Sequence, residues 1–237
     1  MKYGLLKAYA RKKDMKRRAA AEKGTVCGEK IISEICGEKI TTLFYRGDST
    51  LIVTVHGGGF LYNSVYDEDA YCAYLNKTSG HSVASLDYTL SYKRAYPTQL
   101  NQCAEQIEML SEKVCPEKLV LIGHSAGANL AAALTLKNIG ENNRIPDMLV
   151  LDYPALDNYK KGSKRKFYPF TFTARTLDTF AEIYCEGREN RRNPYVSPLF
   201  AEDAELKLFP PTYWLKRKAT GWGKTRNECM KNFRRSE

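Results

Sequence analysis

The feature that most constrains the fold lies at residues 118–137, KLVLIGHSAGANLAAALTLK. Its first five residues are an apolar run rich in β-forming side chains, and its last ten have the alanine and leucine content of a helix. Between them GHSAG fits the pattern G-x-S-x-G, in which a serine lies on a sharp strand-to-helix turn with its hydroxyl exposed. The stretch predicts a strand, a turn carrying Ser125 and a helix, and we call residues 123–127 the elbow.

Steric crowding explains why the elbow has glycine at two positions. So tight a turn brings the chain on both sides of the serine together, and we expect Cβ atoms at Gly123 and Gly127 to collide with their surroundings. The following helix directs its positive end toward Ser125, which favours negative charge beside that hydroxyl. The five-residue pattern is common in loops, so the flanking strand and helix carry the interpretation.

A second glycine cluster follows another buried strand. Residues 51–55, LIVTV, are continuously apolar, as in a strand covered on both faces, and HGGGF follows at residues 56–60. Three glycines let backbone N–H groups approach a ligand without obstruction, and paired N–H groups are what an oxyanion requires. A flexible linker is the alternative for this segment, which we call the glycine loop.

The rest of the chain alternates between strands and helices. The predicted elements are a hairpin within 25–45, helices at 67–78 and 97–113, and strands at 81–88 and 147–153. This alternation predicts the α/β class, with a mostly parallel central sheet flanked by helices, in one domain over residues 24–214.

Residues 157–196 lack a strand period and are basic and aromatic. We expect a cap-like insertion over the carboxyl edge of the sheet, where such sheets bind ligands. Its aromatic side chains line an acyl pocket or pack in the core, and both alternatives stay open. These side chains are Phe167, Tyr168, Phe170 and Phe172.

The formal charge of +10 is concentrated at the two ends of the chain. Residues 1–23 hold nine Lys/Arg against two acidic residues, and residues 212–237 hold eight against two, so the body between them is mildly acidic. No nucleic-acid recognition motif accompanies the charge, so a nucleic-acid partner is not expected. The basic N-terminal helix expected at residues 2–22 is a lid, a membrane-surface helix or a solvated arm.

The expected compartment is the cytoplasm. The N-terminus has no apolar core of signal-peptide length, and no transmembrane segment is evident. Seven cysteines without a CxxC pair fit reduced thiols better than a disulfide framework or a zinc site. The oligomeric state is not indicated by the sequence.

Five segments together resemble the hormone-sensitive-lipase-like branch of the α/β-hydrolases, over about residues 48–214. They are HGGGF at 56–60, DYTL at 87–90, GHSAGANL at 123–130, NPYVSPL at 193–199 and FPPTYW at 209–214. The resemblance implies an esterase or lipase-like activity on small acyl esters, in which a serine attacks the ester carbonyl and forms an acyl-enzyme. It implies no metal or organic cofactor, because side chains and backbone N–H groups suffice for this chemistry.

The resemblance assigns roles residue by residue. Ser125 becomes the nucleophile, and the N–H groups of Gly58, Gly59 and Ala126 hold the oxyanion. The remaining motif residues support these four, namely His56, Gly57, Gly123, His124 and Gly127.

The chain departs from the family where the catalytic acid and base are expected. In this fold the order is Ser, then Asp or Glu, then His, but the last aspartate is Asp203 and no histidine follows His124. We expect His56 to support the glycine loop, His124 to point away from Ser125 and His81 to be structural. None of them is expected to act as the general base.

The segment at residues 215–237 is basic and lacks the apolar period of the family's last strand and helices. Our hypothesis is a truncated or frameshifted C-terminus, with the reading frame lost between Tyr213 and Lys216. A sheet without its last strand exposes an edge and apolar faces, which predicts poor solubility.

The leading interpretation is a serine carboxylic-ester hydrolase whose turnover is impaired by the missing acid and base. The alternative is a non-catalytic ligand-binding protein on the same scaffold. A third interpretation, binding of an anionic partner through the basic ends, predicts salt-dependent association with DNA.

Overall fold

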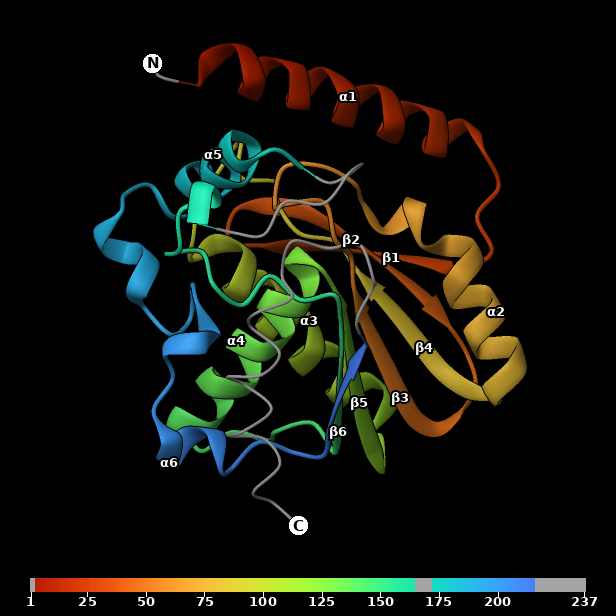
Figure 1. Cartoon of the computed structure of the whole chain (residues 1–237). Helices are drawn as coiled ribbons and strands as arrows, with labels where there is room; N and C mark the ends of the chain where they lie inside the picture. The colour runs from red at the N-terminus through yellow and green to blue at the C-terminus, as the bar shows by residue number, and fades with distance from the viewer. Residues whose placement is uncertain (1–2, 165–171, 216–237) are drawn as a thin grey trace.

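The computed structural model describes residues 3–164 and 172–215. Within these ranges the chain forms a seven-stranded sheet in the order β1-β2-β4-β3-β5-β6-β7, covered by helices (Figure 1). The strands are β1 (Glu29–Ile35), β2 (Glu38–Tyr45), β3 (Asp48–Val55), β4 (His81–Leu86), β5 (Lys118–His124), β6 (Met148–Asp152) and β7 (Thr212–Leu215).

The first two strands form the predicted antiparallel hairpin, and β2 pairs antiparallel with β4. All the other pairings are parallel. In the central pairing Val55 at the end of β3 lies opposite Gly123 near the end of β5. This register places the glycine loop, which follows β3, beside the elbow, which follows β5. The sequence prediction of a mostly parallel α/β sheet is confirmed.

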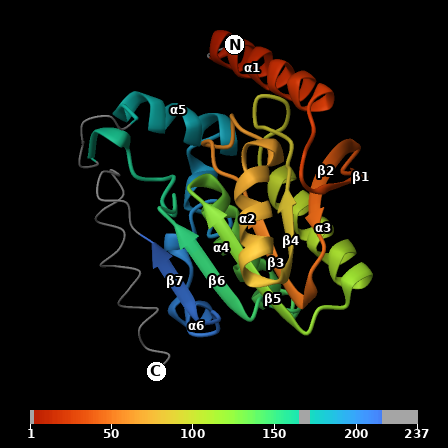
Figure 2. The ribbon, with the colours of Figure 1, turned by 90° about the vertical axis from the view of Figure 1, so that its right-hand side faces the viewer.

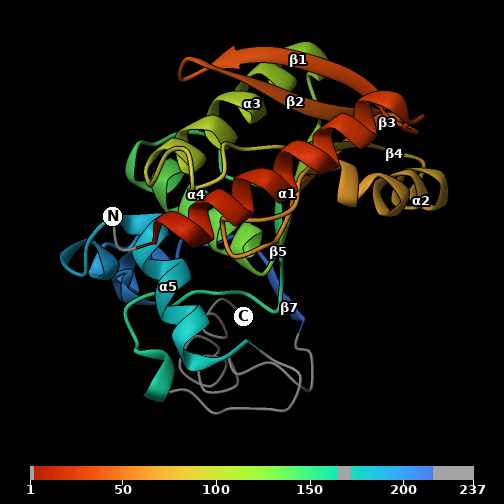
Figure 3. The ribbon, with the colours of Figure 1, turned by 90° about the horizontal axis from the view of Figure 1, so that it is seen from above.

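Helices pack on both faces of the sheet, with α3 and α4 on one side and α2 on the other (Figure 3). Almost all of α4 is buried, which explains why its sequence is apolar on every side rather than on one stripe. The sheet's core strands are β3 and β5, whose inner residues are covered on both faces. The three helices that pack on the faces of the sheet are α2 (Asp69–Ser79), α3 (Thr98–Val114) and α4 (Ala126–Gly140).

Two further helices, α1 and α5, lie above the carboxyl ends of the parallel strands (Figure 2). α5 comes from the insertion predicted at 157–196, and α1 is the predicted basic N-terminal helix. Their bounds are Gly4–Lys23 for α1 and Ala174–Cys185 for α5. The remaining short elements are α6 (Asp203–Leu206) and the 3-10 turns η1 (Val65–Asp67), η2 (Gly162–Lys164), η3 (Glu189–Arg192) and η4 (Pro198–Phe200).

Three predictions fall partly or wholly outside the described ranges. Of the four aromatic side chains proposed for an acyl pocket, only Phe172 is described; it is exposed, and its ring contacts that of Phe180 edge-on. The basic tail predicted at residues 215–237 lies outside the described ranges except for Leu215. The frame change proposed between Tyr213 and Lys216 falls at the end of the described ranges, and the structure does not test it. None of the helices in the described ranges has both the length and the apolar character of a membrane span.

Candidate active site

Ser125 lies in the sharp turn between β5 and α4, as the elbow pattern predicts. Its backbone has φ 54° and ψ −109°, a conformation that residues with a Cβ rarely adopt. The turn is held from three sides: the Ser125 N–H donates to the carbonyl oxygen of Asp152 at 2.9 Å, and its own carbonyl accepts from the N–H groups of Asn129 and Ala155, each at 3.2 Å. Neighbouring elements therefore fix a strained conformation, which is common at functional sites.

Both elbow glycines are required by close backbone contacts. A Cβ on Gly123 would lie 2.5 Å from the carbonyl oxygen of Gly127, and a Cβ on Gly127 would collide with the carbonyl oxygens of Val55 and His56. The steric prediction for these two positions is confirmed. The second contact also shows that the first turn of α4 packs directly on the start of the glycine loop.

The glycine loop lies against the nucleophile position itself. A Cβ on Gly57 would lie 3.3 Å from the Cβ of Ser125. Gly58 has φ 120° and Gly59 has φ 62°, so the backbone of both takes a course that side chains disfavour. Among the residues that the structure describes, no acceptor is found for the N–H groups of Gly58, Gly59 or Ala126. These are the three N–H groups that the resemblance assigns to an oxyanion.

All three histidines of the chain are bonded to carboxylates away from Ser125. The Nδ1 atom of His124 lies 3.2 Å from Asp152, the Nδ1 of His81 lies 2.8 Å from Asp48, and the Nε2 of His56 lies 3.4 Å from Asp87. Within the described ranges, no hydrogen bond joins any of these imidazoles to the Ser125 hydroxyl.

The His56–Asp87 pair is buried, with each side chain about 1% exposed. Burial lowers the pKa of the His56 imidazole, but the hydrogen bond and charge of Asp87 outweigh it, and the pKa lies above its usual value. Burial likewise raises the pKa of Asp87, and the bond from His56 and the charge of Arg18 more than reverse this, so the pKa is lowered. The two groups therefore favour their charged forms.

The sequence analysis gave no role to Asp87, although DYTL at 87–90 begins with it, and it did not single out Arg18. Asp87 follows β4, a neighbour of β3, so strand adjacency alone places it beside the glycine loop. Arg18 gave no such signal, because it is one of eight cationic side chains in a basic helix. It reaches Asp87 at 2.5 Å across 69 positions of the chain.

Aromatic side chains of α5 cover the glycine loop. The Phe60 and Tyr184 rings stack with centroids 3.7 Å apart, and Tyr62 contacts Phe180 edge-on at 5.9 Å. A Cβ on Gly59 would collide with the Phe180 ring. The insertion therefore contributes apolar surface directly above the loop.

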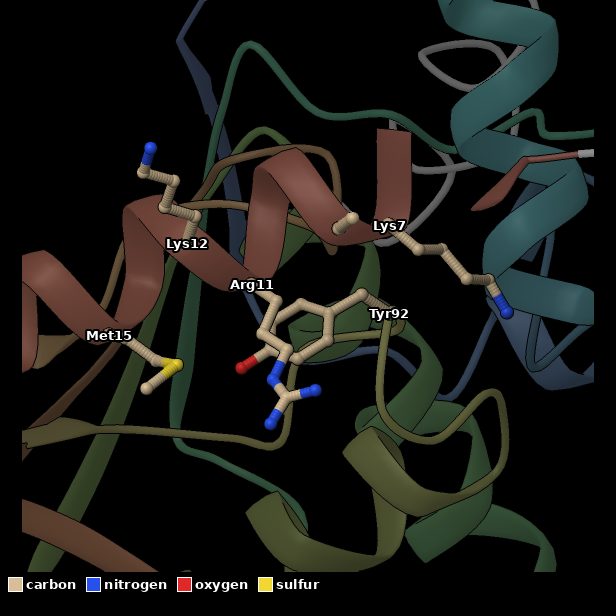
Figure 4. A pocket seen from close by; sticks show the side chains of 6 residues that line it. Lys7, Arg11, Lys12, Met15 and Tyr92 are labelled. Atoms are coloured by element: carbon tan, nitrogen blue, oxygen red, sulfur yellow. The ribbon is translucent and has the colours of Figure 1, made fainter. Parts of the chain in front are cut away.

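The helix α1 packs against the same region and is not a detached arm. Leu6 joins an apolar cluster with Leu61 and Phe180, and the Tyr92 hydroxyl donates to Asp14 at 2.9 Å. A groove of about 470 Å³ lies between α1 and Tyr92 (Figure 4). Half of its lining residues are basic, and none belongs to the elbow or the glycine loop; the lining consists of Lys7, Ala8, Arg11, Lys12, Met15 and Tyr92.

Comparison with known proteins agrees with this geometry. The family described as the alpha/beta hydrolase fold matches residues 52–216, more than half of the chain. An arylesterase of Saccharolobus solfataricus is 29% identical over 168 residues, which cover 67% of this chain and 54% of that protein. The bovine (Bos taurus) hormone-sensitive lipase is 30% identical over 111 residues, covering 44% of this chain and 15% of the lipase. The chain thus matches about half of the arylesterase's length and much less of the lipase's.

Solved structures share the fold. Carboxyl esterase 2 of Tuber melanosporum superposes with a TM-score of 0.81 at 23% identity, covering 89% of this chain and 72% of that one. An esterase of Pyrobaculum calidifontis superposes with a TM-score of 0.78 at 20% identity, covering 98% of this chain and 85% of the esterase chain. The chain belongs to the α/β-hydrolase fold family, and its relatives include esterases and hormone-sensitive lipase.

Proposed function

We propose that the chain binds small acyl esters above Ser125 and that Ser125 attacks the ester carbonyl. The N–H groups of Gly58, Gly59 and Ala126 would then donate to the oxyanion that develops on the carbonyl oxygen. One observation carries this proposal: the strained serine at the N-terminus of α4 lies against a glycine loop whose N–H groups have no acceptor in the described ranges. The names of the related esterases support the substrate class.

We further propose that turnover by this chain is impaired. A serine hydroxyl is a weak nucleophile at neutral pH unless a base takes its proton. Each imidazole is bonded to a carboxylate instead, and none reaches Ser125. Stabilisation by the oxyanion site would remain, and such a site alone supports a residual acceleration over water of about 10³-fold in serine proteases.

The same observation favours a second candidate, a ligand-binding protein that does not hydrolyse. A site with an oxyanion-binding loop and no general base retains affinity for a carbonyl or carboxylate group. In that case Ser125 contributes a hydrogen bond and not a covalent intermediate.

The test is hydrolysis of a short-chain nitrophenyl ester by the full chain, by Ser125→Ala and by the control Ser111→Ala, which changes a half-buried serine of α3. We expect slow turnover that Ser125→Ala abolishes and Ser111→Ala retains. Imidazole at tens of millimolar hydrolyses nitrophenyl esters by itself, so its effect is measured as the difference in rate between the full chain and Ser125→Ala at the same imidazole concentration. We expect this difference to grow, because imidazole replaces the missing base. Equal rates in all three chains would overturn the enzymatic proposal. Ester-analogue binding that persists in that case would support the second candidate.

A further inference from the structure

Arg18 of α1 is one end of a buried series of charged groups. Its Nη1 atom donates to the Oδ2 of Asp87 at 2.5 Å, and its Nε lies 3.0 Å from both carboxylate oxygens of Asp14. Asp87 is about 1% exposed, whereas Arg18 is 31% exposed, so the guanidinium separates a buried carboxylate from solvent. Arg18 also keeps a pKa above its usual value: burial works against this, but the charge of Asp87 prevails.

The series continues from Asp87 to the glycine loop. The Oδ1 atom of Asp87 lies 3.4 Å from the Nε2 of His56, and the Nδ1 of His56 lies 2.8 Å from the carbonyl oxygen of Gly57. A carboxylate and a carbonyl can only accept, so both bonds form together only when His56 is doubly protonated. The His56 ring also stacks on Tyr88, whose hydroxyl donates to the His56 carbonyl oxygen at 3.0 Å.

The two oxygens of Asp87 have different sets of partners. Oδ2 accepts from the Nη1 of Arg18, and this is the shorter of the two bonds from Arg18. Oδ1 accepts from the Tyr88 N–H at 3.0 Å and from the Nη2 of Arg18 at 3.4 Å, and it faces the Nε2 of His56. Without Arg18 a buried carboxylate oxygen would have no cation, and the carboxylate would rotate or draw in water to satisfy it. His56 would then lose its fixed partner, and the Gly57 carbonyl would lose the imidazolium that orients it.

We propose that Arg18 is a positioning residue for the oxyanion site: through Asp87 and His56 it fixes the Gly57 peptide, and with it the N–H groups of Gly58 and Gly59. The docked helix α1 is then part of the site although it contributes no group to the ester. The proposal rests on the function proposed above, but the order of the His56 imidazole can be measured without it.

The test compares Arg18→Ala with Arg17→Ala in the full chain. Arg17 is the matched control, because it also ties α1 to the body, through an ion pair with Asp67 at 3.0 Å, but does not reach Asp87. The first measurement is the rate at which an alkyl fluorophosphonate labels Ser125. We expect about a tenfold or larger loss in Arg18→Ala, since a misplaced oxyanion site loses transition-state stabilisation, and less than about a twofold loss in Arg17→Ala.

The second measurement is the His56 imidazole N–H proton signal in a chain labelled with ¹⁵N-histidine, assigned with His81→Asn and His124→Asn. This signal is expected to persist in Arg17→Ala and to disappear by exchange with water in Arg18→Ala. Guanidinium ion at millimolar concentration, far below denaturing levels, is expected to restore part of the labelling rate and part of the His56 N–H signal in Arg18→Ala. If Arg18→Ala does not fold, Arg18→Lys serves instead, with a smaller loss expected because lysine lacks the fork that spans Asp14 and Asp87.

The outcomes separate the two proposals. Absence of labelling in every chain would overturn Ser125 as nucleophile, and the His56 signal alone would then decide the role of Arg18. An unchanged His56 signal in Arg18→Ala would overturn the positioning role. Equal losses in Arg17→Ala and Arg18→Ala would also overturn it, because helix docking in general would then explain the effect.

Discussion

The Cβ atom that Gly57 lacks would lie 3.3 Å from the Cβ of Ser125 and 2.8 Å from the carbonyl oxygen of His124. The glycine loop and the elbow are therefore in direct backbone contact, and a methyl group at Gly57 forces one of them to move. The second distance is the severe one, because a backbone carbonyl in a parallel sheet cannot turn aside.

Gly57→Ala is accordingly expected to lower the free energy of unfolding by about 1–3 kcal/mol, as overpacked sites do, and to slow fluorophosphonate labelling of Ser125. The control is Gly4→Ala, at a position with no atom within 4 Å of the added Cβ. Denaturant titration and labelling rates measure the two effects. Equal behaviour of the two variants would contradict the contact.

Glycine is favoured at position 59 for two reasons: its φ is positive, and there is no space for a Cβ atom. Its φ is 62°, and a Cβ there would collide with the Phe180 ring of α5. Gly37 has a similar φ of 71° but open space around it. We expect Gly37→Ala to lower the free energy of unfolding by about 1–2 kcal/mol, because of backbone strain alone. Gly59→Ala is expected to lower it by more.

Phe180→Ala provides the second half of this test. In that background the cost of Gly59→Ala is expected to fall to the Gly37→Ala value, because only the backbone term remains. The measurement is a double-mutant cycle by urea denaturation. An interaction energy of zero would show that α5 does not press on the glycine loop.

Much of the fold was predictable because its signals are local. The apolar run at residues 51–55, the glycines of the elbow and the alternation of strands with helices each specify structure within a few residues. Two parallel strands that end side by side then bring the glycine loop and the elbow together without further information. The roles assigned to Ser125, Gly58, Gly59 and Ala126 remain predictions, whereas their juxtaposition is observed.

The contacts that hold the site from outside, namely the Arg18–Asp87 bond and the docking of α1, were not predictable from the sequence. The bond between Arg18 and Asp87 joins positions 69 residues apart, and nothing in a helix with eight Lys and Arg residues marks one of them as the partner of a buried carboxylate. The docking of α1 likewise depends on tertiary packing, since the sequence left a lid, a membrane-surface helix and a solvated arm open. In the structure the helix packs against α5 and Leu61, the residue that follows the glycine loop.

The His56–Asp87 pair makes a prediction about pH. The lowered pKa of Asp87 contributes stability above the unfolded value of about 4, and this contribution is lost as the pH falls through the folded value. The raised pKa of His56 contributes stability that is complete below about 6.5 and is lost as the pH rises through the folded value. The stability difference between the native chain and Asp87→Asn is therefore expected to be largest between about pH 4 and 6.5.

Within that window we expect Asp87→Asn to lower the free energy of unfolding by about 3 kcal/mol, because the substitution leaves Arg18 and His56 facing a neutral partner. Thermal melts across pH 3–9 on both chains measure the difference. Asp48→Asn is the control, since its pair with His81 is exposed. A difference independent of pH would mean that the buried pair is not ionised.

Two fully buried tyrosines provide the last prediction. The hydroxyl of Tyr88 donates to the His56 carbonyl oxygen at 3.0 Å, whereas that of Tyr184 has no partner among the described residues, although its ring stacks on Phe60. Removing a bonded hydroxyl costs about 0.5–1.5 kcal/mol, and removing an unsatisfied one relieves a desolvation penalty. We expect Tyr88→Phe to destabilise the chain and Tyr184→Phe to leave it unchanged or more stable by about 1 kcal/mol. Denaturant titration of the two variants decides the question: equal destabilisation would mean that the Tyr184 hydroxyl is bonded, and that α5 is tied to the glycine loop by more than the stacked rings.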